Sequence, residues 1–412
     1  MVERVEFTKE MKKDYTILVP NMLPVHFKIM KPIFENEGYK IEFLNNDGNS
    51  VVNNGLKYVH NDTCYPALLV IGQMIDALNS GKYDIHKVAL MITQTGGGCR
   101  ASNYIHLLRK ALVKAGYGFI PVISLNIGGL EKNSGFKLNL KMIQRALAAL
   151  VYGDLIMLVA NQTRPYEIDK VTDEKIDKWA IYLADLLNDN KGYSKKDLKK
   201  YCKAIVEDFA AIRLAKTNKI KVGIVGEIYV KYAPLGNNNL EKFLQSQNVE
   251  YMIPGVMGFA LYCIDNGLID HELYGGNIIK KYIYDFFYHY MLDLESIIYN
   301  SVKNYSSFNP GSRFENGKKL GEKIIGLGCK MGEGWLLTSE IMELCEMGYD
   351  NIICTQPFGC LPNHINGKGM VRKITEVVSN ANIVAIDYDP SATSVNQENR
   401  IKLMLSIASQ KA

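Results

Sequence analysis

Short apolar runs alternate with longer segments of helical periodicity in the first third of the chain. The β-rich runs cover residues 15–19, 40–44, 88–93 and 120–125, and the helical segments between them cover 26–37, 64–78 and 101–115. Strands separated by helices of about ten to fifteen residues are typical of right-handed βαβ units, which build a parallel sheet. The pattern therefore predicts an α/β lobe at the start of the chain.

The strand signal disappears between residues 166 and 216, where two amphipathic helices fit around a polar, Gly-containing turn at 188–194. Strands are predicted again at 221–225, 351–354 and 383–386, and helices at 240–246, 278–305, 335–346, 363–378 and 396–409. We therefore predict an α/β protein with two flavodoxin-like, doubly wound parallel-sheet lobes and helical inserts.

A length of 412 residues exceeds what one hydrophobic core usually serves, which also indicates more than one domain. We predict an N-terminal α/β lobe at 14–165, a helical segment at 166–218 and a C-terminal α/β lobe at 219–412. The C-terminal lobe is expected to contain a helical insertion at about 275–320.

Composition narrows the class of protein. Hydrophobic residues make up 47% of the chain and charged residues 22%, as in globular proteins. The net charge of +5 is small, and basic and aromatic residues do not gather in one stretch, so no nucleic-acid partner is expected. The first 13 residues are charged and no run of about 18 uncharged apolar residues occurs, so we expect a cytoplasmic protein without a membrane span.

Eight cysteines in a reducing compartment are better candidates for metal ligands, catalysts or core residues than for disulfides. Ligands of open α/β sheets bind where strands end and helices begin. Four cysteines occupy such predicted positions: Cys64, Cys99, Cys354 and Cys360. Cys202, Cys263 and Cys345 fall in apolar or helical patterns typical of core cysteines, and Cys329, in the Gly-rich loop 326–334, fits either interpretation.

Cysteine suits these loops chemically. Free N–H groups and the positive dipole at a helix N-terminus lower a thiol pKa. The neighbouring Gly97, Gly98 and Gly359 allow close backbone approach and N–H donation to a bound group. Soft thiolates favour iron–sulfur or zinc, and the lack of a Cys-x₂-Cys pair makes zinc the weaker alternative. Spacing alone also fits inert cysteines packed at strand ends.

Other residues in these loops are weaker candidates. His364 is a candidate proton donor, although a capping or core role fits it equally. Glu333 is a second catalytic candidate, and Glu227 lies in a similar strand-end position. The stretch 359–369, with Lys368, could contact a phosphate, but neither common nucleotide-binding glycine motif is present.

Four motifs resemble those of a known family: HNDTCYPA at 60–67, TGGGCRASNY at 95–104, GEGW at 332–335 and QPFGCLPNH at 356–364. The chain is similar, from about residue 14 onward, to the activase-related proteins of the 2-hydroxyacyl-CoA dehydratase system. Their superfamily includes the dehydratase subunits, the benzoyl-CoA reductase subunits and the double-cubane cluster proteins.

The resemblance implies a [4Fe-4S] cluster between two flavodoxin-like lobes. Matched position by position, Cys64, Cys99 and Cys360 correspond to the motif cysteines, with Cys354 as the candidate fourth ligand. The alternative cofactor is a double-cubane [8Fe-9S] cluster that recruits Cys329 and Cys345. Three thiolates would leave one iron open, whereas four would favour electron transfer.

The resemblance also implies partners and strictly anaerobic chemistry. These residues hold no counterpart of the actin-like ATPase domain fused in larger relatives, so an ATP-hydrolysing activator on another chain is expected to supply low-potential electrons. The electrons would serve reductive chemistry on an acyl-CoA or another small substrate; the alternatives are a double-cubane reductase and a non-catalytic carrier or maturation subunit. A homo- or heterodimer is expected, with the tyrosine-rich stretch 282–290 as a candidate interface, although buried packing would explain it equally.

Overall fold

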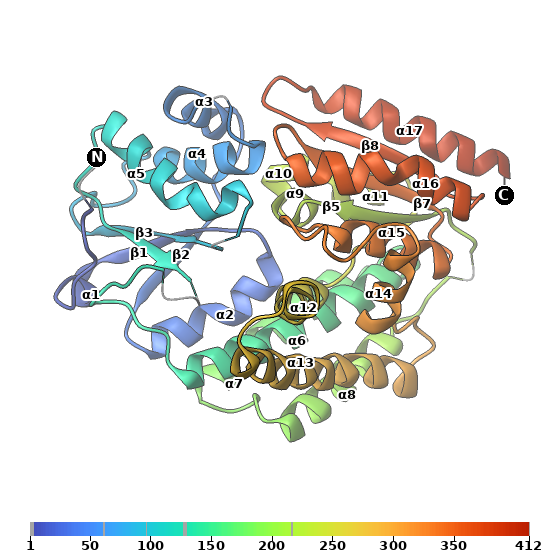
Figure 1. Cartoon of the computed structure of the whole chain (residues 1–412). Coiled ribbons are helices and arrows are strands. Elements are labelled where there is room, and N and C mark those ends of the chain that lie inside the picture. Colours follow the sequence, from blue (N-terminus) through green and yellow to red (C-terminus); the bar gives the residue numbers. More distant parts are fainter. Residues whose placement is uncertain (1–3, 61, 96, 127–129, 216, 412) are drawn as a thin grey trace.

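Two parallel sheets of four strands organise the chain in the computed structural model, which describes residues 4–60, 62–95, 97–126, 130–215 and 217–411 (Figure 1). The first sheet has the order β2-β1-β3-β4, built from β1 (Thr16–Pro20), β2 (Lys40–Leu44), β3 (Val88–Thr93) and β4 (Val122–Leu125). The second has the order β6-β5-β7-β8, built from β5 (Lys221–Gly226), β6 (Glu250–Met252), β7 (Asn351–Pro357) and β8 (Asn382–Tyr388). The predicted α/β fold of two parallel-sheet lobes is confirmed.

Helices cover both faces of the first sheet because its strands alternate between two cores. Ile17 faces one hydrophobic cluster and Leu18 the other, as the two-residue period of a strand requires. The helices of this lobe are α1 (Met11–Asp14), α2 (Pro24–Asn36), α3 (Asn49–Tyr58), α4 (Tyr65–Asn79), the 3₁₀ turn η1 (Arg100–Asn103) and α5 (Tyr104–Lys114). The α4 helix shares the cluster of Leu18, whereas α2 shares that of Ile17.

A layer of long helices connects the two lobes (Figure 1). It consists of α6 (Leu140–Thr163), α7 (Thr172–Asn188), α8 (Lys195–Ala210), α12 (Val256–Tyr274) and α13 (Ile278–Tyr305). The α6 helix contacts α2 of the first lobe and β6 of the second. The α6 helix is long and apolar enough to cross a membrane. However, 67% of its most apolar stretch is buried in the protein, and a core helix has the same length and composition.

The remaining helices surround the second sheet. They are α9 (Ile228–Tyr232), α10 (Pro234–Asn237), α11 (Leu240–Ser246), α14 (Phe314–Glu322), α15 (Trp335–Glu346), the π-helical η2 (Asn363–Gly367), the 3₁₀ turn η3 (Lys368–Met370), α16 (Val371–Val377) and α17 (Ser394–Lys411). The single helix expected at 363–378 is therefore divided into three short segments. The first segment ends at Gly367, and the second contains Gly369.

The same strand order in the two sheets places their loops in equivalent positions. Strand order reverses between β1 and β3 and again between β5 and β7, and such points are where open α/β sheets bind ligands. The two lobes meet at these carboxyl-end loops, because the N–H of Tyr65, at the start of α4, donates to the carbonyl of Phe358, which follows β7 (2.9 Å).

Candidate functional site

Three cysteines lie at the junction between the lobes. Cys64 immediately precedes α4, Cys99 immediately precedes η1, and Cys360 follows β7. Cys64 and Cys360 pack together with Ala67 in a small buried cluster, against which Tyr104 packs. The Cys99 sulfur faces the loop before α15, since a Cβ placed on Gly332 would lie 3.9 Å from it. The structure thus brings Cys64, Cys99 and Cys360 into one site.

Glycines allow these loops to approach each other. Gly359 has a φ of +72°, and a Cβ there would lie 3.2 Å from the Cα of Cys64, so a side chain is disfavoured on both grounds. A Cβ on Gly98 would overlap the flexible Met331 side chain of the other lobe, whereas Gly97 faces open space. Asn61 and Gly96 of the motifs lie outside the described residues.

Hydrogen-bond donors point at the three sulfurs. Backbone N–H groups one to three residues further along each chain segment interact with the thiols, as expected at the start of helical turns. The Tyr104 hydroxyl lies 3.0 Å from the sulfur of Cys64, and the amide Nδ2 of Asn363 donates to the sulfur of Cys360 (3.4 Å). Such donors stabilise a thiolate or a metal-bound sulfur.

Burial nevertheless outweighs these donors. It raises the pKa of Cys64 to about 11, and it raises the pKa values of Cys99 and Cys360, with the charges of Glu227 and Glu333 adding to the effect at both. The net effect on the pKa of each of these three thiols is therefore a rise, opposite to the lowering expected at a helix N-terminus. Without a bound metal the thiols stay protonated at neutral pH, so binding a metal must displace protons.

Two buried carboxyl groups from the second lobe accompany the thiols. Glu227 follows β5 and accepts a hydrogen bond from the N–H of Val230 (2.9 Å), and Glu333 precedes α15 and accepts one from the N–H of Ile228 (3.0 Å). Burial raises the pKa of both, and the charge of Glu333 raises that of Glu227 further. The site can therefore hold exchangeable protons on carboxyl oxygens near the sulfurs.

A buried ion pair fixes the segments that carry these carboxyl groups. The Lys231 ammonium, on α9, donates to both oxygens of Glu340, on α15, at 2.8 and 3.0 Å. Both side chains are at most 4% exposed. Because α9 follows Glu227 and α15 follows Glu333, the pair joins the two helices that begin at these carboxyl groups.

Replacing Glu227 with glutamine should stabilise the protein at alkaline but not at acidic pH. The folded protein holds the Glu227 proton above the ordinary glutamate pKa of about 4.3, so the wild type loses stability as pH rises through that value and beyond, while glutamine is neutral throughout. We expect a gain of roughly 1–3 kcal/mol in the free energy of unfolding at pH 8 and a negligible change at pH 4.5, measured with urea.

The exposed Glu174, changed to glutamine, serves as the control and should show no such pH-dependent difference. An equal effect of Glu227→Gln at both pH values would contradict a raised pKa.

His364 lies beside the site rather than among the sulfurs. It is exposed, and its Nδ1 lies 2.6 Å from the amide nitrogen of the buried Gln356. Since the amide donates to Nδ1, the proton of the neutral ring is on Nε2. The His364 ring therefore faces solvent beside the site, whereas Glu333, the other candidate proton donor, is buried within it.

Cys354 occupies a different place from the one expected. Its strand continues to Pro357, so Cys354 lies inside β7 rather than at its end, and its fully buried side chain belongs to the core cluster of the second lobe. A Cβ on Gly367 would lie 3.1 Å from its sulfur. The structure does not bring Cys354 together with the other three thiols.

The remaining cysteines are also dispersed. Cys345 belongs to the same core cluster and lies near the C-terminal end of α15, whereas the site is at its start. Cys202 is fully buried among the connecting helices, and Cys263 lies on α12. Cys329 is exposed in the loop before α15, and its carbonyl accepts from the N–H of Trp335 (2.7 Å).

The spacing of the three thiols differs from that of a single-ion site. Among the described residues, no three His, Cys, Asp or Glu side chains are grouped closely enough to hold one metal ion. Cysteines of an iron–sulfur cluster bind different iron atoms, so their sulfurs stand farther apart than the ligands of one ion. As they stand, the three thiols therefore do not form a site for a single metal ion.

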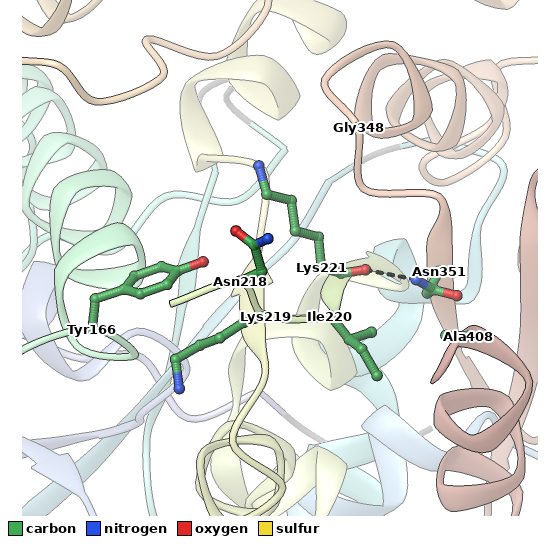
Figure 2. A pocket seen from close by; sticks show the side chains of 8 residues that line it. All are labelled: Tyr166, Asn218, Lys219, Ile220, Lys221, Gly348, Asn351 and Ala408. Atoms are coloured by element: carbon green, nitrogen blue, oxygen red, sulfur yellow. Dashed lines mark hydrogen bonds between the residues drawn. The ribbon is translucent and has the colours of Figure 1, made fainter. Parts of the chain in front are cut away.

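A separate open pocket of about 360 Å³ lies at the amino ends of β5 and β7 (Figure 2). It includes Lys219 and Lys221, whose side chains point to different sides, and Asn351, whose side chain donates to the carbonyl of Lys221 (3.0 Å). This pocket is about 20 Å from the carboxyl ends, given the length of a six-residue strand, and is not part of the thiol site.

Comparisons with known proteins add no family assignment. No protein-family model matches the chain, and no curated protein is significantly similar to it.

Tyr104 and Met331 are among the site residues that had no role assigned from sequence. Tyr104 closes the motif at 95–104, but its contact with Cys64 is 40 positions away along the chain. Met331 precedes the motif at 332–335, and its contact with Gly98 depends on the packing of the lobes. The sequence feature that could have indicated a role for these two residues is their position inside or next to an unusual motif.

Proposed function

We propose that the chain holds a [4Fe-4S] cluster on Cys64, Cys99 and Cys360, accepts low-potential electrons from a separate ATP-hydrolysing activator, and delivers them to a small substrate such as an acyl-CoA or to a partner subunit. The observation that carries the proposal is the convergence of three thiols from two lobes on one junction. The cluster would supply one-electron chemistry at low potential.

The donor set fits this group. Three soft sulfurs with nearby N–H and O–H donors match the ligation of iron–sulfur clusters, which hydrogen bonds to sulfur tune. The positions of Cys354 and Cys345 in the core of the second lobe favour three thiolates over four, and a single cubane over a double one. A set of three leaves one iron for another ligand.

The other residues of the site have supporting tasks. Ala67 and the aromatic ring of Tyr104 exclude water from the side of Cys64 and Cys360. Glu227 and Glu333 retain protons on their carboxyl groups and can release them when charge builds up nearby. Proton supply of this kind suits reductive chemistry, in which each added electron raises proton affinity.

An apolar rim around the junction suits a protein partner. Phe358 and Leu361 flank Cys360 and are 55% and 67% exposed, and Met331, which contacts Gly98 across the junction, is 57% exposed. Met and aromatic residues are enriched at protein interfaces. We assign this rim to the docking of the electron donor.

Purification under strict exclusion of oxygen tests the proposal. We expect a brown protein with about four iron and four sulfide per chain, and a paramagnetic signal after reduction with titanium(III) citrate. A colourless, iron-free protein, also after incubation with ferrous iron and sulfide, would falsify it. A labile, substoichiometric cluster without turnover would favour a carrier or maturation subunit.

A further inference from the structure

A second cavity, of about 140 Å³, lies between the second lobe and the connecting helices. Its walls come from α6, the β6–α12 junction, α13, the start of α14 and one face of α15. The described residues that line it include none of the three thiols at the junction of the lobes. The cavity is therefore a separate place in the fold, and nothing so far assigns it a ligand.

Apolar and flexible side chains form most of the cavity wall. Four methionines line it, together with the rings of Tyr299 and Phe314. Methionine adapts to the shape of a ligand, and its sulfur makes favourable contacts with aromatic rings. An apolar cavity of about 150 Å³ in another protein holds benzene, so this cavity has room for one six-membered ring. The methionines are Met157, Met252, Met257 and Met347.

A glycine of α12 leaves part of this space open. Gly258 lies in the first turn of the helix and lines the cavity. A Cβ added to it would meet no neighbouring side chain within 4 Å. A larger residue at this position would therefore project into the cavity without first displacing another group.

Four carboxyl groups also line the cavity, and one of them lacks a cation. The other three have basic partners, in the pairs Asp154–His26 (2.9 Å), Glu295–Arg313 (2.7 Å) and Glu340–Lys231 (2.8 Å). The fourth, Glu343, interacts with the Ser312 hydroxyl but forms no ion pair with any described residue. Burial and the charge of Glu340 raise the pKa of Glu343, so this carboxyl keeps its proton unless a cation lies beside it.

Ser339 is a second polar group of the cavity without a partner. Its side chain is 2% exposed, and its hydroxyl makes no hydrogen bond to any described residue. Buried hydroxyl groups normally have such a partner. Ser339 precedes Glu343 by four residues, so the two side chains lie one turn apart on the face of α15 that lines the cavity. An ammonium group has three N–H donors and can serve both oxygens.

We propose that the cavity binds a small cation made of one apolar ring and a primary ammonium group. The ammonium donates to the carboxylate of Glu343 and to the hydroxyl of Ser339, and the ring packs against the methionines. An apolar pocket with a few convergent polar groups is the usual form of a small-molecule site. The surrounding carboxyl groups select a cation over an anion of the same shape. Binding does not depend on a cluster at the thiols.

Isothermal titration calorimetry of the full-length protein with benzylamine and benzyl alcohol tests the proposal. The two probes have nearly the same shape, but only benzylamine carries an ammonium group at neutral pH. We expect the wild type to bind benzylamine with a Kd of about 1 mM or lower, and benzyl alcohol at least about 10-fold more weakly. Glu343→Gln should bind both probes with about the same affinity, because the charged partner is gone.

Two further variants locate the site. Glu346→Gln makes the same chemical change at an exposed position of α15 and should keep the preference for benzylamine. Gly258→Leu should abolish the binding of both probes, with circular dichroism showing that the protein remains folded. A wild type that binds neither probe, a Glu343→Gln protein that still prefers benzylamine, or a Gly258→Leu protein that binds it normally would overturn the proposal.

Discussion

Replacing Cys99 with alanine should yield a folded protein that no longer retains iron. Cys99 is only partly buried, so its loss costs little packing, whereas the proposed cluster loses one of three protein ligands. Iron content should fall from about four per chain to less than about one, measured by iron and sulfide analysis and visible absorption after anaerobic purification. Thermal unfolding of the iron-free proteins should be nearly the same for variant and wild type.

Two further cysteine variants make the result specific. Cys202→Ala removes a fully buried thiol among the connecting helices and should keep the full iron content. Cys354→Ala tests whether the cluster has three or four protein ligands. Because Cys354 lies in the core of the second lobe, this variant should keep the normal iron content. Iron retained by Cys99→Ala would contradict the assignment of Cys99 as a ligand.

Replacing Lys231 with methionine should reduce the free energy of unfolding by about 3–5 kcal/mol, because it leaves the carboxylate of Glu340 buried without its cation. The ammonium also favours the charged forms of Glu227 and Glu333, so its removal should raise the pKa values of these groups as well. Urea-induced unfolding at pH 7 provides the measurement.

The double variant Lys231→Met with Glu340→Met should recover most of the lost stability, because apolar side chains of similar size replace both charges. Lys28→Met serves as the surface control. Its ion pair with Asp177 is 42% and 70% exposed, so it should change stability by no more than about 1 kcal/mol. A double variant as unstable as Lys231→Met alone would show that the pair is not the cause.

The elements that sequence predicted well were those with a clear period. Strands near 40–44 and 88–93 and the helices at 335–346 and 278–305 appear with these same bounds. The α12 helix was missed because its apolar residues are spread around the helix, and β6 because it has only three residues. The helical insertion of the C-terminal lobe therefore begins at Val256, shortly after β6, and not at about residue 275 as predicted.

Strand β7 shows how buried polar residues make the end of a strand difficult to predict from sequence. The strand was predicted to end at Cys354, before the polar Thr355 and Gln356. In the structure Thr355 and Gln356 are fully buried, and their side chains bond to the carbonyl of Val225 and to His364. These partners come from elsewhere in the fold, which sequence periodicity does not record.

The candidate site was predictable where chemistry coincides with strand ends. Cys64, Cys99 and Cys360 were selected on that basis and through the family resemblance, and they do meet at one junction. The partnership of Lys231 and Glu340 was not predictable, because the two residues are 109 positions apart and Glu340 follows two other polar residues, Thr338 and Ser339, from which its sequence position does not distinguish it. Only tertiary packing reveals such pairs.

The division of the thiols between two sheets has a mechanical consequence. Cys64 and Cys99 move with the first sheet and Cys360 with the second, while α6 contacts both lobes and the Tyr65–Phe358 hydrogen bond joins them at the junction. A rigid-body rotation of one lobe would change the distance between sulfurs without disturbing either sheet. A group that bridges the three sulfurs would therefore also tie the two lobes together, in addition to α6 and the Tyr65–Phe358 hydrogen bond.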